Sequence, residues 1–114
     1  MPASLQILKC NSNKLTKLDN LPLDLKKLNC SDNLISKLDN LPLGLKSLDC
    51  EFNRIVGLDY LPINLRHLDC SNNSITSLDN LPPNLETMRC EWNYIAFIDS
   101  LPSTLCVLLA CHNS

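Results

Sequence analysis

The residues with the most reactive side chains in this sequence are the cysteines. Seven occur in 114 residues, and five of them recur at intervals of twenty, as Cys10, Cys30, Cys50, Cys70 and Cys90. A thiol ladder for metal or redox use is one interpretation, but structural zinc sites usually place paired ligands about two to four residues apart. A cysteine that repeats in phase with leucine instead occupies a core position, where it behaves as a small hydrophobic residue. We therefore expect buried, unpaired thiols and a reducing compartment.

The other two cysteines lie near the C-terminus with one of the two histidines. Cys111 and His112 are adjacent, as a nucleophile and a base would be, but neighbouring residues of a strand point to opposite faces. Cys106, Cys111 and His112 offer three ligands to a metal ion and lack a fourth. The two glycines form no phosphate-binding loop. We expect no catalytic residues, no metal and no cofactor.

Two polar columns repeat with the same period of twenty. One contains asparagine, at Asn13, Asn33, Asn53, Asn73, Asn93 and Asn113. An amide both donates and accepts, so a stacked asparagine ladder satisfies the backbone groups of a buried turn. The other column contains Asp19, Asp39, Asp59, Asp79 and Asp99. We expect these carboxylates to accept hydrogen bonds from the N–H groups that follow them. Calcium is the alternative, but it needs about six to eight oxygen ligands.

All these columns belong to one repeating unit. Leu-Pro begins successive copies at Leu21, Leu41, Leu61, Leu81 and Leu101, which gives repeats 1–20, 21–40, 41–60, 61–80 and 81–100 and a partial repeat 101–114. A short fixed period predicts a solenoid, because each repeat buries its apolar side only against its neighbours. We expect a single domain spanning 1–114.

The unit itself predicts strands without helices. Its Leu-x-Cys segment alternates apolar and polar residues, which favours a short half-buried strand. Proline recurs every twenty residues, so each return to the next strand has only about ten residues and is extended or a single turn. The strands should stack in parallel, about 4.8 Å apart.

The composition narrows the function. The chain is 45% hydrophobic and 19% charged, as in a globular protein, and its net charge of −2 gives no field to hold nucleic acid. No apolar run reaches the roughly 18 residues that a membrane span needs. The N-terminal residues lack the basic start of a secretory signal. We expect no nucleic acid, no membrane and a cytoplasmic location.

The string LxxLxCxxNxIxxLDNLP resembles a leucine-rich repeat, and the resemblance covers the full chain. In Leu85-x-x-Met88-x-Cys90-x-x-Asn93-x-Ile95 the family core is present with cysteine in its sixth place. The Leu-Pro return is similar to the twenty-residue class of bacterial type III effectors and of proteins of large DNA viruses. This resemblance implies a fold that is α/β by family convention, namely a right-handed solenoid with six short parallel strands on the concave side, extended convex segments and little or no helix. It also implies a location inside a host cell if the protein is viral or an effector. The helical cap and ubiquitin-ligase domain of such effectors have no counterpart here, so ligase activity is not expected.

The outward-facing strand columns vary from repeat to repeat while the scaffold does not. We therefore predict a non-enzymatic protein-interaction module whose partner binds the concave face at Phe52, Arg54, His67, Arg89, Trp92 and Tyr94. Aromatic residues and arginine dominate interface hot spots. Alternatively, Trp92 folds back on Tyr94 and merely shields the sheet. A basic stripe at Lys26, Lys46 and Arg66 is either a solvated face or a contact for an acidic partner.

The last repeat departs from the pattern. Alanine replaces cysteine at position 110, and the normally polar strand positions hold Val107 and Leu109. An apolar strand with an unpaired edge favours association. The alternative function is therefore that of a self-assembling structural protein. It would associate, for example as a homodimer, through its C-terminal repeat, with contacts at Cys106, Val107, Leu109 and Cys111.

Overall fold

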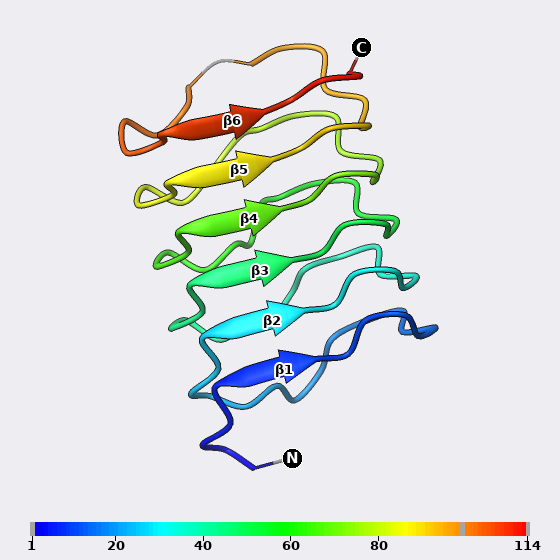
Figure 1. Cartoon of the computed structure of the whole chain (residues 1–114), viewed down its shortest axis with the longest axis vertical. Helices are drawn as coiled ribbons and strands as arrows, with labels where there is room; N and C mark the ends of the chain where they lie inside the picture. The colour runs from blue at the N-terminus through cyan, green and yellow to red at the C-terminus, as the bar shows by residue number, and fades with distance from the viewer. Residues whose placement is uncertain (1, 99, 114) are drawn as a thin grey trace.

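The computed structural model describes residues 2–98 and 100–113 and contains one six-stranded parallel sheet. Its strands are β1 (Ile7–Lys9), β2 (Lys27–Asn29), β3 (Ser47–Asp49), β4 (His67–Asp69), β5 (Thr87–Arg89) and β6 (Val107–Leu109). Each strand pairs with the next one in sequence, so the sheet order is the chain order. Figure 1 shows the strands stacked on one face and the extended return segments behind them, wound as a right-handed solenoid.

The register of the sheet equals the sequence period. Leu48 pairs with Leu28 of the preceding strand and with Leu68 of the following strand, and both partners lie one repeat from Leu48 in the sequence. Every residue is therefore stacked on the same column position of the neighbouring repeats. The sheet places a column of residues twenty apart in sequence within side-chain contact of one another.

The Leu-Pro step forms the turn that leads into each strand. The N–H of Leu45 donates to the carbonyl oxygen of Pro42 at 3.1 Å, and the same bond occurs in every repeat, from Leu5 to Pro2 through Leu105 to Pro102. Proline lacks a donor but accepts normally, so it closes this tight turn without losing a bond. The turn ends any helical tendency, and the described residues contain no helix.

The core consists of the repeated apolar columns. In the third repeat Leu45, Leu48, Cys50, Ile55 and Leu58 are all buried, and the same positions are buried in the second and fourth repeats. The two ends differ: Leu5, Leu8 and Cys10 at one end and Leu105, Leu108 and Ala110 at the other are only partly buried. A repeat therefore completes its burial only between two neighbours, as expected of a solenoid.

The asparagine column forms the predicted ladder. The Asn53 amide donates from Nδ2 to the carbonyl oxygens of Cys50 (3.1 Å), Glu51 (3.2 Å) and, in the preceding repeat, Cys30 (3.0 Å). Its Oδ1 accepts from the N–H of Ile35, also in the preceding repeat, at 3.0 Å. Asn33, Asn73, Asn93 and Asn113 repeat this pattern. Each amide thus closes its own turn and joins it to the turn below.

The residue before each asparagine has a left-handed backbone. This column is Ser12, Asp32, Phe52, Asn72, Trp92 and His112, with φ between 54° and 60°. The left-handed conformation turns the chain sharply out of the strand, and the N–H of Phe52 still bonds to the Ser71 carbonyl oxygen at 3.0 Å. Asparagine and aspartate suit this conformation, whereas bulky side chains rarely adopt it.

The aspartate column does not behave as predicted. No hydrogen bond among the described residues runs from a backbone N–H to the carboxylate of Asp19, Asp39, Asp59 or Asp79; the fifth member, Asp99, lies outside the described residues. Instead Asp19 pairs with Lys17 (3.2 Å), and Asp59 accepts from the Asn80 amide (3.3 Å). These carboxylates are partly or fully exposed, so water satisfies them and no backbone bond is needed.

Within residues 2–98 and 100–113 there is no helix with the length and hydropathy required to cross a bilayer.

The ladder gives a first prediction. Asn53→Ala should lower the free energy of unfolding by about 1–3 kcal/mol, because one N–H and three carbonyl groups of two turns lose their partner. Denaturant unfolding monitored by circular dichroism measures the change. Ser47→Ala, on the open face of β3, is the matched control and should cost less than about 0.5 kcal/mol. Equal losses for the two variants would contradict the structural role of the asparagine.

Candidate partner-binding surface

The outward side of the sheet, with the residues just after each strand, forms one surface, which we call the sheet face. Its first column is Ile7, Lys27, Ser47, His67, Thr87 and Val107, its second is Lys9, Asn29, Asp49, Asp69, Arg89 and Leu109, and its third is Asn11, Ser31, Glu51, Ser71, Glu91 and Cys111. The left-handed column of Ser12, Asp32, Phe52, Asn72, Trp92 and His112 is its fourth. The strand residues between them, such as Leu48 and Leu68, point into the core. The alternation of the strands therefore places the predicted columns outside.

Three carboxylates meet at the centre of the sheet face. Asp49, Glu51 and Asp69 each bring an oxygen within 4.8 Å of the others, the one such group of three acidic, histidine or cysteine side chains among the described residues. Sequence reasoning did not single out this group. The signal was present, because Asp49 and Asp69 occupy the same column of adjacent repeats and Glu51 stands two residues after Asp49.

The crowding changes the ionisation of the cluster. The pKa of Glu51 rises from 4.5 to about 7, because its carboxyl shares a hydrogen bond with Asp69, loses water and faces the charges of Asp69 and Asp49, while Arg89 opposes the rise. The pKa of Asp49 also rises, chiefly because of partial burial. Glu51 therefore changes charge near neutral pH.

Arg89 balances part of this negative charge. Its guanidinium bonds to the Glu91 carboxylate through Nη2 (3.0 Å) and Nε (3.3 Å), and its Nη1 lies 3.9 Å from Asp69 Oδ2. Both donors share one acceptor, Glu91 Oε1, in a charge-assisted contact. The predicted anchor Arg89 thus contacts Glu91 through Nε and Nη2 and faces Asp69 through Nη1. Its side chain remains more than half exposed.

Trp92 is the largest exposed aromatic residue of the sheet face. Its ring stacks on the ring of His112 in the next repeat, with centroids 3.9 Å apart and planes within 8°. The alternative in which Trp92 folds back on Tyr94 is not what the structure shows. Trp92 is still 55% exposed, so His112 covers one side of the indole and leaves the rest accessible.

Phe52 occupies the same column as Trp92, two repeats earlier. It is 53% exposed and has a φ of 54°. A left-handed conformation at a bulky residue is unfavourable by roughly 1–2 kcal/mol. Neither burial nor backbone geometry accounts for an aromatic residue here.

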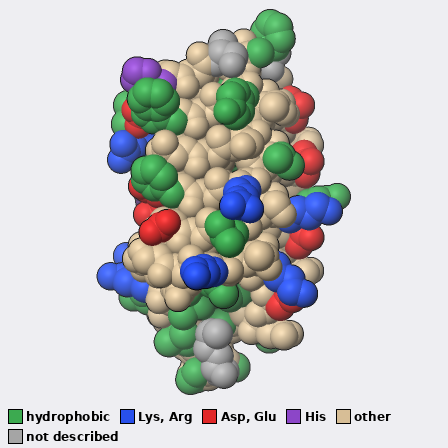
Figure 2. All heavy atoms as spheres, turned by 90° about the vertical axis from the view of Figure 1, so that its right-hand side faces the viewer, with side chains coloured by type: hydrophobic (Ala, Val, Ile, Leu, Met, Phe, Trp, Pro, Cys, Tyr) green, Lys and Arg blue, Asp and Glu red, His purple; other side chains and the backbone are tan. Residues whose placement is uncertain are grey.

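The other predicted anchors lie at different places. His67, in the first column of β4, shares a hydrogen bond with the Thr87 hydroxyl at 2.8 Å. Arg54 and Tyr94 come after the left-handed turn, where their N–H groups bond to Ile35 and Ile75 of the preceding repeat, and both side chains are exposed. These two side chains therefore stand at the border between the sheet face and the return segments. Figure 2, which looks onto the ends of the strands, shows hydrophobic side chains set singly among charged ones over its upper part.

The C-terminal repeat exposes the residues named for self-association. Val107 is 46% and Leu109 42% exposed, and Cys106 and Cys111 are exposed as well. Cys106 donates weakly to the Thr104 carbonyl oxygen at 3.4 Å. Cys106, Cys111 and His112 are not among the side chains that come together as a group of three.

The periodic cysteines are free thiols in the core. Cys30, Cys50, Cys70 and Cys90 are buried and Cys10 is half-buried. Burial raises the pKa of Cys30 to about 12 and of Cys90 to about 11, and raises the pKa of Cys50 and Cys70 strongly. Two of the thiols donate to carbonyl oxygens of the next repeat, Cys50 to Asp69 (3.4 Å) and Cys70 to Arg89 (3.3 Å). Burial therefore favours the protonated thiol at these positions of the core.

Comparison with known proteins gives a consistent result. A family model for the leucine-rich repeat matches residues 64–88. Among solved structures, YopM from Yersinia enterocolitica is 35% identical, with a TM-score of 0.92, over 99% of this chain and 25% of that one. The leucine-rich-repeat domain of a Shigella effector is 35% identical, with a TM-score of 0.90, over 96% of this chain and 50% of that one.

A third similar structure is also a repeat domain with cysteines. The functional domain of InlJ from Listeria monocytogenes, described as including a cysteine ladder, is 30% identical with a TM-score of 0.61, over 96% of this chain and 30% of that one. No curated protein sequence matches the chain. The chain spans between a quarter and a half of the YopM and Shigella structures.

The acidic cluster predicts a specific pH dependence. The folded-state pKa of Glu51 lies above its usual value of 4.5, so the folded protein holds a proton that the unfolded chain has lost, between pH 4.5 and about 7. This contribution to stability is complete below pH 4.5 and is lost as the pH rises through about 7. The denaturant midpoint should therefore fall between pH 5 and pH 8, and Glu51→Gln should reduce that fall.

Glu86→Gln is the control for this experiment, because Glu86 pairs with Arg66 (3.7 Å) away from the cluster. It should keep the pH dependence of the parent protein. A Glu51→Gln variant with the same dependence as the parent would show that the cluster does not hold the proton.

Proposed function

Since this chain is a leucine-rich repeat protein of the twenty-residue class, we propose that it is a non-enzymatic module that binds a protein partner through its sheet face. The fold itself supports protein binding, because repeat solenoids present an extended surface whose residues vary without disturbing the core. We propose both the surface on which the partner binds, which is the sheet face, and the residues that anchor it.

The observation that carries the proposal is the placement of Phe52 and Trp92. Both stand more than half exposed in a left-handed column where four other residue types are tolerated, and where a bulky side chain is unfavourable. An aromatic residue that stabilises neither core nor backbone is explained by contact with a partner. Strained residues concentrate at functional sites for this reason.

The surroundings of these rings suit an interface hot spot. Trp92 is oriented by His112, and Arg89 is oriented by Glu91 and Asp69, so little side-chain freedom is lost on binding. His67, Arg54 and Tyr94 would contact the partner around this centre. The acidic cluster beside Arg89 favours a partner with basic residues at the matching place.

The cysteine chemistry supports the non-enzymatic assignment and a location in a reducing compartment. The exposed free thiols of Cys106 and Cys111 would be liable to oxidation outside the cell, since disulfides form in oxidising compartments. We place the protein in the cytoplasm, including that of a host cell, in keeping with its likeness to the Shigella effector domain.

A displayed library of random peptides tests the sheet face directly. Peptides selected on the immobilised protein should bind Trp92→Ala at least tenfold more weakly, because truncation of a hot-spot aromatic costs about 2 kcal/mol or more. Phe97→Ala is the matched control, since Phe97 is an aromatic residue 80% exposed on a return segment. Calorimetric titration of the selected peptides gives both affinities. Peptides that bind Trp92→Ala and the parent equally would refute the assignment of the sheet face.

Self-assembly through the C-terminal repeat is the second candidate. The exposed apolar side chains of β6, together with its unpaired edge, favour it. Light scattering after size exclusion, in reducing buffer over a concentration series, should then show a dimer or larger species. Leu109→Lys should return the protein to a monomer, whereas Trp92→Ala should not. A monomer at all concentrations would rule out this candidate and leave the sheet-face proposal standing.

A further inference from the structure

The fourth column of the sheet face alternates between small polar and large aromatic side chains in its middle repeats. Asp32 is followed by Phe52, then by Asn72 and then by Trp92, one repeat apart each time. All four residues have a φ between 54° and 58°, so their side chains leave the turn at equivalent places. Adjacent strands lie about 4.8 Å apart, so residues of this column that are two repeats apart are separated by about 9.6 Å. Phe52 and Trp92 therefore border a gap whose floor is Asn72.

The stacking of Trp92 fixes one wall of this gap. Its indole ring lies against His112 of the following repeat, with centroids 3.9 Å apart and planes within 8°. Because His112 is the next residue of the same column, the indole stands across the column and its other face is directed toward Asn72. Phe52 borders the opposite side, and both aromatic side chains are more than half exposed. The gap is therefore open to a ligand from the solvent.

The width of the gap favours a ring that is thicker than an aromatic one. A flat ring between two others needs about 7–8 Å, because carbon atoms in contact lie about 3.5–4.0 Å apart. A gap of about 9.6 Å instead suits the puckered ring of proline. Proline-rich segments bind aromatic-lined grooves in several domain families, where their rigid polyproline II helix loses little entropy.

The floor of the gap adds a polar group. The backbone N–H of Asn72 is bonded to the Glu91 carbonyl oxygen at 2.8 Å, but no hydrogen bond engages its side chain within residues 2–98 and 100–113. No buried polar side-chain atom of these residues lacks a partner, so the amide of the half-buried Asn72 is in contact with solvent. Such an amide donates readily to a carbonyl oxygen of a ligand. A polyproline II segment has no internal hydrogen bonds, so its carbonyl groups are free to accept.

A carboxylate lies two repeats before this floor in the same column. Asp32 is exposed and takes part in no ion pair in the part of the chain that the structure describes. The distance from Asp32 to Asn72 along the column is about 9.6 Å, twice the spacing of adjacent strands. A polyproline II segment advances about 9.3 Å in three residues, because its rise is about 3.1 Å per residue. Two residues of such a segment that are three positions apart thus match Asp32 and Asn72, and charge complementarity favours a basic residue at Asp32.

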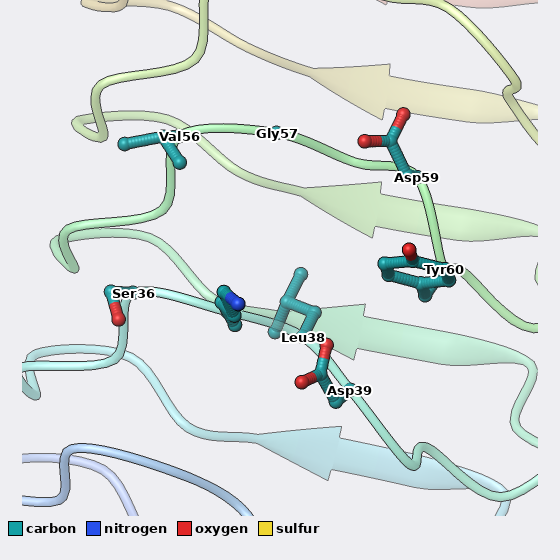
Figure 3. A pocket seen from close by; sticks show the side chains of 8 residues that line it. Ser36, Leu38, Asp39, Val56, Gly57, Asp59 and Tyr60 are labelled. Carbon is teal, nitrogen blue, oxygen red and sulfur yellow. The ribbon is translucent and has the colours of Figure 1, made fainter.

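The hollow on the return side is a less suitable place for a ligand. It has a volume of about 110 Å³ and lies beside Tyr60, with Lys37 already in its wall. Figure 3 shows the Tyr60 ring between Asp39 and Asp59, so these two carboxylates do not act as a pair. Asp59 also accepts a hydrogen bond from the Asn80 amide of the following repeat at 3.3 Å. We therefore place the ligand on the sheet face.

We propose that the fourth column binds a proline-rich segment of the protein partner, in the polyproline II conformation and running along the solenoid axis. A proline of this segment enters the gap between Phe52 and Trp92, and a neighbouring carbonyl oxygen accepts from the Asn72 amide. An arginine three residues from this proline pairs with Asp32, because its planar guanidinium reaches a carboxylate through two N–H groups. The inference rests on the proposed sheet-face binding and names the class of its partner.

The test is a titration of the whole chain with short peptides, read from the fluorescence of Trp92, the only tryptophan in the sequence. Acetyl-Arg-Pro-Ala-Pro-amide and acetyl-Pro-Ala-Pro-Arg-amide carry the required spacing in the two chain directions. One of them should shift the emission of Trp92 to shorter wavelength in a saturable manner, because a ring in the gap removes water from the indole. The dissociation constant should be about 0.1–1 mM, as expected of a tetrapeptide.

Isomers of the two peptides provide the control for spacing. In acetyl-Arg-Pro-Pro-Ala-amide and acetyl-Ala-Pro-Pro-Arg-amide the composition is the same, but no proline lies three residues from the arginine. Each isomer should bind at least tenfold more weakly than the peptide with the required spacing in the same chain direction that binds.

Two substitutions locate the contacts on the protein. Phe52→Asn supplies a residue that suits the left-handed backbone, so the fold is retained, and it should weaken peptide binding at least tenfold because one wall of the gap is lost. Asp32→Asn removes only the charge and should weaken binding about two- to fivefold, as the loss of an exposed ion pair does. Asp79→Asn makes the same charge change at an exposed position of a return segment and should leave the affinity unchanged.

Equal binding of the isomeric peptides, or an Asp32→Asn variant that binds as the parent does, would overturn the proposal. Tighter binding of acetyl-Arg-Pro-Ala-Tyr-amide than of acetyl-Arg-Pro-Ala-Pro-amide would also overturn it, because the gap would then suit an aromatic side chain. The absence of a saturable shift with either proline peptide would do the same. In that case the peptides selected from the random library decide the wider question: if they depend on Trp92, the sheet face remains the binding surface and only the proline-rich ligand is refuted.

Discussion

The rest of this structure depends on the asparagine amide that joins each turn to the turn before it. A twenty-residue repeat is too short to satisfy its own turn, because the tight exit from the strand leaves carbonyl groups directed into the core. The asparagine side chain supplies the missing partners. Asn53, for example, donates to the carbonyl oxygens of Cys50 and Glu51 in its own repeat and of Cys30 in the preceding repeat, and it accepts from the N–H of Ile35 there. None of the buried side-chain nitrogen or oxygen atoms of the described residues is left without a partner. The polar interior is therefore complete, and an apolar residue at this column would unbalance two repeats at once.

That constraint also explains where the chain is free to vary. The ladder fixes the residues that point inward, and the strand alternation leaves every second position outside, so the sheet face carries charges, small polar residues and aromatics on one scaffold. Glu51 and Asp69 lie close enough to share a hydrogen bond, since stacking places their repeats side by side. The left-handed position before each asparagine belongs to the same turn, and a bulky residue at this position has an energetic cost. Phe52 and Trp92 adopt this unfavourable conformation although neither side chain is buried.

The sequence alone predicted the repeat, the register, the six parallel strands, the return segments without helix and the roles of the asparagine and cysteine columns. Each of these features recurs five or six times at the same period of twenty residues. The candidate site was harder to predict from the sequence. The contact of Trp92 with His112, and the group formed by Asp49, Glu51 and Asp69, join residues of different repeats, and only a count in steps of twenty brings them together. The aspartate column shows the opposite error: repetition alone suggested a backbone role, but the carboxylates are solvated and pair with side chains such as Lys17. Periodicity indicates that a residue type has a role in every repeat, whereas the burial of its side chain determines whether its polar groups need partners within the protein.

In a repeat protein the departures from the pattern therefore carry more information about function than the pattern does. A consensus residue is explained by stacking on its neighbours, as Leu48 is, whereas a departure must be explained by something outside the stack. Phe52 and Trp92 are departures of this kind, in a column that suits neither ring. A thin solenoid, 18 Å across its shortest axis, exposes both of its sides to solvent, so no neighbouring layer of the protein covers such a residue.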